Sequence, residues 1–209
     1  MTELVSDIKF FWEAFVTLLV ITDPPGVVPV FLGMTASRPK PERNRLAWQA
    51  AVVAFGVIVA FAAFGRSILS YLGVELPSLQ AAGGLLLLLV ALELLTGKAA
   101  EPNELEQAQA NVAFVPLGTP LLAGPGAIVA TMLFVQRITS VGAGIAFSGA
   151  IVAVVILLWL AMRFSGVVLA LLKRSGVELL TRIAGLLLSA IAVQLIVDAV
   201  RALIKAGLH

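Results

Sequence analysis

Two short segments, placed alike in the two halves of the chain, interrupt apolar stretches with residues that break a helix. They are Asp23-Pro24-Pro25-Gly26 and Ala123-Gly124-Pro125-Gly126. A helix that restarts after such a break begins with unpaired N–H groups and the positive end of its dipole, which attract carboxylate oxygens. The helix before the break ends with unpaired carbonyl groups, which suit an ammonium group or a cation. The two breaks together therefore predict a binding site for a zwitterion such as an amino acid.

The predicted site consists of the breaks and the residues beside them. The amides expected to be free are those of Gly26, Val27 and Val28 after the first break and of Gly126, Ala127 and Ile128 after the second. Threonines (Thr22, Thr119 and Thr131) are the polar side chains in an otherwise aliphatic lining, which favours a substrate with an uncharged side chain. The candidate substrate-binding residues are Thr22, Asp23, Pro24, Pro25, Gly26, Val27, Thr119, Ala123, Gly124, Pro125, Gly126 and Ala127.

Asp23 is the residue with the sharpest chemistry, because a carboxylate inside an apolar span is costly and points to a functional site. It could receive the ammonium group of the substrate or carry a coupling proton. An aspartate before a proline is also a common helix N-cap, and the two roles can coexist. The second break has Ala123 at the matching position, so the expected site is asymmetric.

The elements that must position these residues are membrane-spanning helices. Of 209 residues, 60% are hydrophobic and 12% charged, and the mean hydropathy is +1.06. This composition predicts an all-α polytopic membrane protein. The chain has no cysteine, and its one histidine is His209, so thiolate and histidine metal sites are not expected. The net charge of +2 comes from loop residues, and no nucleic-acid partner is expected.

Six spans are predicted, and spans one and four carry the breaks. They cover residues 8–34, 46–64, 79–95, 112–136, 141–162 and 179–204. Short similarities relate the halves: Gly73-Val74-Glu75-Leu76 matches Gly176-Val177-Glu178-Leu179. Because three is an odd number, a second three-helix copy must be inverted in the membrane. We therefore predict a single transmembrane domain over residues 1–209, with repeat one at about 8–97 and repeat two at about 112–206.

The orientation follows from lysine and arginine near the span ends. The loops after spans one, three and five carry eight such residues, against five on the opposite face. This excess favours a multi-pass protein of the cell (inner) membrane with both termini outside. The oligomeric state stays open.

Other charged residues and most glycines have structural interpretations. Glu93 is expected at the interface near Lys98, and Asp198 is expected to pair with Arg201 at helical spacing. Glycines are expected to allow close helix packing, at Gly83, Gly84, Gly142, Gly144, Gly149 and Gly185.

Several of these strings resemble the MarC family of six-span inner-membrane proteins. The first is Asp23-Pro24-Pro25-Gly26 followed by Val28-Pro29-Val30-Phe31, and the most specific runs from Pro120 to Ile128. The resemblance covers essentially the whole chain. It implies secondary transport of small neutral amino acids such as glycine or alanine, coupled to an ion gradient, with no catalytic residues. Pro25 stands where the family often has another small or polar residue, which removes one amide donor from the first break.

Alternatives stay open at this point. A passive channel or facilitator, an exporter of another small zwitterion, an intramembrane enzyme and a non-transporting scaffold are the rivals. The absence of cysteine and of an internal histidine leaves little chemistry for an enzyme. The transport direction and the coupling ion, H+ or Na+, are not fixed by the sequence.

Overall fold

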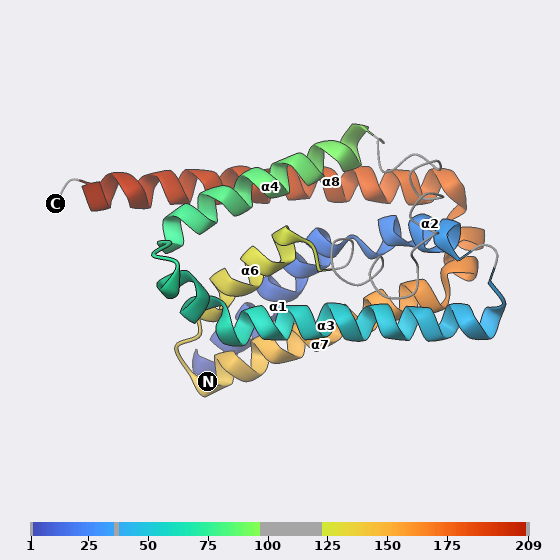
Figure 1. The fold of residues 1–209 in the computed structure, drawn as a ribbon, viewed down its shortest axis with the longest axis horizontal. Helices are drawn as coiled ribbons and strands as arrows, with labels where there is room; N and C mark the ends of the chain where they lie inside the picture. Colours follow the sequence, from blue (N-terminus) through green and yellow to red (C-terminus); the bar gives the residue numbers. More distant parts are fainter. Residues whose placement is uncertain (1, 36–37, 97–122, 208–209) are drawn as a thin grey trace.

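The structure is a computed structural model that describes residues 2–35, 38–96 and 123–207, and in these ranges it is helical without strands. Figure 1 shows the arrangement. The helices are α1 (Thr2–Thr22), α2 (Pro24–Met34), α3 (Lys40–Tyr71), α4 (Leu76–Thr96), α6 (Pro125–Gln136), α7 (Val141–Arg163) and α8 (Ser165–Gly207). The predicted all-α fold class is confirmed.

Five helical segments are long and apolar enough to cross a membrane, and a shorter apolar helix accompanies them. The five are Val5–Met34, Lys40–Tyr71, Leu76–Thr96, Val141–Arg163 and Ser175–Lys205, and the shorter helix is Gly126–Gln136. Five of the six predicted spans correspond to the long segments. Of the predicted fourth span, residues 112–122 lie outside the described residues.

Local chemistry explains where the helices begin and turn. The Ser140 hydroxyl caps α7 by accepting a hydrogen bond of 3.0 Å from the Ala143 amide. Gly73, with a φ of 64°, provides the left-handed turn between α3 and α4. Lys173, with φ 55° and ψ 174°, interrupts helical geometry inside α8. A short first part of α8 is therefore followed by the long membrane-spanning part.

Buried apolar side chains divide into two clusters. The larger joins α1, α2, α3, α6 and α7 around Leu18, Phe31, Ile58 and Leu158. The smaller joins α4 to α8 through side chains that include Leu87 and Leu188. In Figure 1, α4 and α8 accordingly lie side by side along one side of the molecule.

The pairing of α4 with α8 is antiparallel and depends on glycines. A Cβ built at Gly84 would lie 2.9 Å from the Ala192 carbonyl oxygen, and one at Gly185 would lie 3.1 Å from the Ala91 carbonyl oxygen. Moving forward along α4 therefore means moving backward along α8. Both glycines serve the close packing predicted from the sequence.

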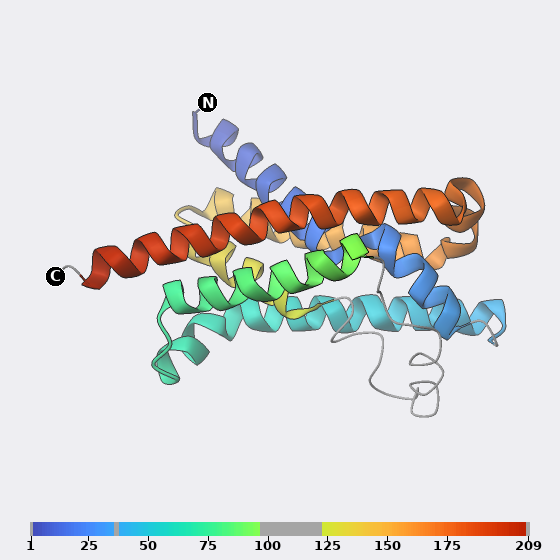
Figure 2. The same ribbon diagram turned by 90° about the horizontal axis from the view of Figure 1, so that it is seen from above.

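Helices α2 and α6 each pack against helices of the other half of the chain. Helix α2 packs against α7 and α8, while α6, at the matching place in the second half, packs against α3 and α4. Helices α3 and α7 contact each other, as do α4 and α8. The start of α1 and the end of α8 lie toward the same end of the long axis in Figures 1 and 2. The division into two inverted repeats, with its boundaries, stays a prediction.

We expect Gly185→Leu to destabilise the protein. A side chain there must force α4 and α8 apart, because the site lies against the Ala91 carbonyl and the Leu94 Cβ atom. Overpacking of this kind costs about 1–3 kcal/mol. Thermal unfolding in detergent should show a clearly lower midpoint. Gly56→Leu is the matched control because nothing lies within 4 Å of a Cβ at Gly56. Equal midpoints for the two variants would contradict the proposed packing role.

Candidate functional site

The first break is a one-residue interruption centred on Asp23. The Asp23 amide donates to the Leu19 carbonyl at 3.1 Å and completes α1, and the Asp23 carbonyl accepts from the Val27 amide at 3.1 Å and begins α2. The backbone of Asp23 adopts the left-handed helical conformation, with φ 39° and ψ 65°. Non-glycine residues in this region store strain of a kind that clusters at functional sites.

The Asp23 side chain is buried without a partner. It is 6% exposed, and within the described residues neither carboxylate oxygen has a hydrogen bond. The Gly26 amide and the Thr181 hydroxyl lie beside it but do not meet hydrogen-bond geometry. It makes no side-chain cap to α2, so the expected N-cap role is absent in its usual form. A buried polar group of this kind is costly unless a proton, a water molecule or a ligand meets it.

Because Gly26 has no side chain, it leaves room for the Asp23 carboxylate. A Cβ built at Gly26 would lie 2.0 Å from Asp23 Oδ2 and 3.1 Å from Thr181 Oγ1. The carboxylate and the Thr181 hydroxyl therefore face the same small region beside the start of α2. Thr181 belongs to α8, far from Asp23 in sequence, and no motif predicted its place.

At the second break, α6 begins at Pro125, with Gly124 as the residue before it. Ala123, Gly126 and Ala127 are buried there. Thr119, predicted as part of this site, lies outside the described residues, as does the apolar stretch that precedes the break.

Two of the amides predicted to be free are not free. The Val27 amide donates to the Asp23 carbonyl, and the Ile128 amide donates to the Gly124 carbonyl at 3.2 Å. The prediction was wrong for these two because the carbonyl of the residue before a helix accepts the first intrahelical bond. The candidate donors nearest the breaks are therefore the amides of Gly26, Gly126 and Ala127.

The two breaks lie close together. A Cβ at Gly126 would lie 3.4 Å from the Ile21 side chain and 2.1 Å from the Leu87 side chain. Ala123 shares a buried cluster with Leu18 and Val27. The Ile21 side chain, at the end of α1, thus packs against Gly126, at the start of α6. A shared substrate site between the breaks stays a prediction.

The threonines of the predicted lining differ in their hydrogen bonding. The Thr22 hydroxyl donates to the Leu19 carbonyl at 3.3 Å and is used within α1. Thr131, in α6, is completely buried, and its hydroxyl has no partner within the described residues. Thr131 is therefore a second unsatisfied polar group in the membrane-spanning region.

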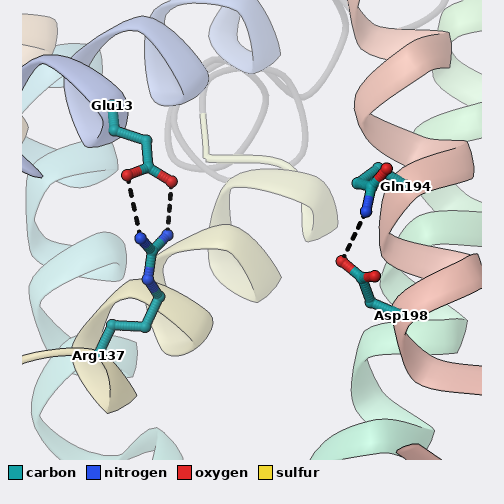
Figure 3. Close-up of polar contacts among 4 residues, drawn as sticks. All are labelled: Glu13, Arg137, Gln194 and Asp198. Atoms are coloured by element: carbon teal, nitrogen blue, oxygen red, sulfur yellow. Dashed lines mark hydrogen bonds and ion pairs between the residues drawn. The ribbon is translucent and has the colours of Figure 1, made fainter. Parts of the chain in front are cut away.

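The other acids inside spans do not join the site. Glu93 is exposed, and its suggested neighbour Lys98 lies outside the described residues. Asp198 accepts a hydrogen bond of 2.9 Å from the Gln194 side chain (Figure 3). The predicted pair with Arg201 was wrong, because the amide one turn earlier on α8 takes the carboxylate instead.

An ion pair joins the two halves at the end of the bundle where the chain begins. Arg137 donates two hydrogen bonds to Glu13, of 2.7 and 3.0 Å (Figure 3). Its guanidinium group also lies over the rings of Phe10 and Phe134. Two parallel bonds fix the guanidinium group more firmly than a single one. The pair ties α1, the helix that precedes the first break, to Arg137, the residue that follows α6.

We expect Arg137→Glu to lower the thermal stability, because it sets two carboxylates against each other and removes the contacts to both rings. A partly exposed pair of this kind contributes about 0.2–1 kcal/mol. Combining Arg137→Glu with Glu13→Arg should recover part of the loss. No recovery in the double variant, measured by thermal unfolding, would show that the attraction between the charges contributes nothing.

Comparison with known proteins agrees with this architecture. The family model described as "MarC family integral membrane protein" matches residues 8–204. The chain is 37% identical over 200 residues to the UPF0056 membrane protein MJ1677 of Methanocaldococcus jannaschii, covering 93% of this chain and 98% of that protein. It is 31% identical to the UPF0056 inner membrane protein MarC of Citrobacter koseri, with coverage of 91% and 93%.

A third relative extends the similarity to another bacterium. The UPF0056 membrane protein YhcE of Escherichia coli is 29% identical, with coverage of 93% of this chain and 94% of that protein. No solved structure shows significant similarity. Because the family model and these relatives each cover nearly all of the chain, from the first broken span to the last helix, the protein belongs to the MarC family of integral membrane proteins.

Proposed function

We propose that this protein is a secondary transporter of small neutral amino acids such as glycine or alanine, driven by an ion gradient. The observation that carries the proposal is the Asp23 carboxylate, buried and unpartnered at the break between α1 and α2. A charge at that depth is expensive unless a ligand or proton meets it during function. The second break, where α6 starts, lies close enough to contribute to the same site.

The chemistry at the two breaks suits the two ends of an amino acid. The ammonium group would donate to the Asp23 carboxylate and to the Thr181 hydroxyl. The substrate carboxylate would accept from the amides of Gly126 and Ala127 at the positive end of α6. The tight approach of Ile21, Gly126 and Leu87 favours a substrate with a small side chain.

Alternating access would come from rocking of the two inverted halves about the site. In such a motion the ion pair between Glu13 and Arg137 would hold one end of the bundle closed, because it ties α1 to the end of α6. Helix α2 packs against α7 and α8, and α6 packs against α3 and α4, so each half of the chain has a short helix that packs against the other half.

Asp23 is also the candidate binding site for the coupling ion. A proton on this carboxylate would remove the buried charge when the substrate is absent, which links substrate release to protonation. Sodium is the alternative, bound at the unpaired carbonyl groups of the last turn of α1. Uptake driven by a pH gradient or by a sodium gradient distinguishes the two.

Solute counterflow in proteoliposomes tests the proposal. Vesicles loaded with unlabelled alanine should transiently accumulate labelled alanine from outside, with saturation and with competition by glycine. A channel gives neither transient accumulation nor saturation. Absence of counterflow for alanine and glycine would overturn the assigned substrate class.

A further inference from the structure

Two oxygen-bearing side chains from distant parts of the chain meet beside Gly26 at the first break. Both carboxylate oxygens of Asp23 are buried and have no hydrogen-bond partner among the described residues. A Cβ built at Gly26 would lie 3.1 Å from Thr181 Oγ1 and still closer to Asp23 Oδ2. The buried carboxylate and the hydroxyl that α8 brings in are therefore close enough to bind one small ligand together.

The backbone of the same break supplies further oxygens. Pro24 and Pro25 have no N–H group. The carbonyls of Val20 and Ile21, four residues earlier, therefore lack the amide donor that would complete the last turn of α1. The break thus gathers carboxylate, hydroxyl and carbonyl oxygens, which are the ligand types that hard cations prefer.

The charge at the break favours a monovalent cation. No described lysine or arginine forms an ion pair with Asp23. One monovalent cation cancels the single buried charge, whereas a divalent ion would leave an excess positive charge, which is costly in a membrane. An amino acid cannot cancel this charge, because a zwitterion carries no net charge. The crowding around Gly26 favours Na+ over the larger K+.

We propose that Asp23 and Thr181 form a sodium-binding site at the first break. The carbonyl oxygens of Val20 and Ile21 would be its backbone ligands, as unwound carbonyls are in other broken membrane helices. The carboxylate has two oxygens and the hydroxyl oxygen has two lone pairs, so both groups can meet the ion and the substrate ammonium group together. Thr181 distinguishes this site from simple protonation, because a proton on Asp23 needs no second oxygen.

Coupling through this site rests on the proposed transport function, whereas ion binding itself needs no amino acid. If alanine is the substrate, one Na+ should accompany each alanine. The bound complex is then neutral, because it contains one carboxylate, one cation and one zwitterion. Alanine uptake should therefore rise with the external Na+ concentration along a simple hyperbola.

Equilibrium binding of radiolabelled Na+ to the purified full chain, without any amino acid, tests the proposal. A scintillation proximity assay with choline chloride at constant ionic strength should show one saturable site per chain. Unlabelled Na+ should displace the label, and K+ should displace it at least about tenfold less well.

Three variants and a matched control test the assigned ligands. Asp23→Asn should abolish Na+ binding, Thr181→Val should weaken it at least about tenfold, and Thr181→Ser, which keeps the hydroxyl, should retain it. Thr96→Val is the matched control, because the Thr96 hydroxyl donates to the Leu92 carbonyl within α4. This control should bind Na+ as the unchanged protein does. Thermal unfolding checks that each variant is folded.

Absence of saturable Na+ binding to the folded chain, or equal binding by Thr181→Val, would overturn the proposal and leave a proton as the ion at Asp23. Failure of the ion site can be told apart from failure of the proposed transport function. Alanine counterflow without Na+ binding would contradict only the ion site. Na+ binding without counterflow would contradict only the amino acid substrate.

Discussion

Asp23→Asn is expected to lower the initial rate of gradient-driven alanine uptake by about thirtyfold or more. The variant keeps the shape of the side chain but removes the charge that meets the ammonium group and that would carry a proton. Losing one partner of a buried charged pair costs about 2 kcal/mol or more. Uptake of labelled alanine into proteoliposomes, with the protein content matched, measures the effect.

The matched control is Asp198→Asn. Asp198 is also an acid in a membrane-spanning helix, but it is only partly buried and accepts a hydrogen bond from Gln194. Its replacement should leave uptake close to that of the unchanged protein. Thermal unfolding should show that Asp23→Asn is folded, since removing an unsatisfied buried charge does not destabilise the native state. Normal gradient-driven uptake by Asp23→Asn would remove this residue from the mechanism.

Gly26→Ala is expected to reduce alanine uptake about tenfold while leaving the charge of Asp23 intact. The added methyl group would sit 2.0 Å from Oδ2 and 2.8 Å from Cγ of Asp23, so the carboxylate must move. Gly26 lies inside α2, where alanine fits helical geometry and is a better helix former than glycine. The variant therefore tests the position of the Asp23 carboxylate, because it changes neither the charge of the carboxylate nor the ability of α2 to form a helix.

Gly56→Ala on α3 is the control for this substitution, because a Cβ there meets nothing within 4 Å. It should transport alanine at the ordinary rate. If Gly26→Ala also transported alanine at the ordinary rate, with unchanged affinity, the position of the Asp23 carboxylate would not matter and the proposed ammonium site would be wrong.

The sequence predicts the helices and the first break because these depend on local chemistry. Runs of apolar residues long enough to cross a bilayer must become helices, since lipid offers no partner for backbone groups. Pro24 and Pro25 supply no amide, which makes an interruption at Asp23 almost unavoidable. The glycine contacts between α4 and α8 follow in the same way, because small residues allow helices to approach closely in lipid.

What the sequence does not predict depends on tertiary packing. The place of Thr181 beside Asp23 depends on how α8 crosses the first break, and no periodicity reveals it. The same holds for the approach of Ile21 to Gly126. The partner of Asp198 was misassigned because Arg201 and Gln194 both lie about one turn away on the helix, and rotamer choice decides between them.

Equilibrium binding of labelled alanine to the full chain in nanodiscs tests the central claim, that both breaks hold one substrate. The account predicts one saturable site per chain, weakened at least about tenfold by Gly26→Ala at the first break and by Gly126→Ala at the second, and unaffected by Gly56→Ala. Binding that persists unchanged when either break is altered would contradict it.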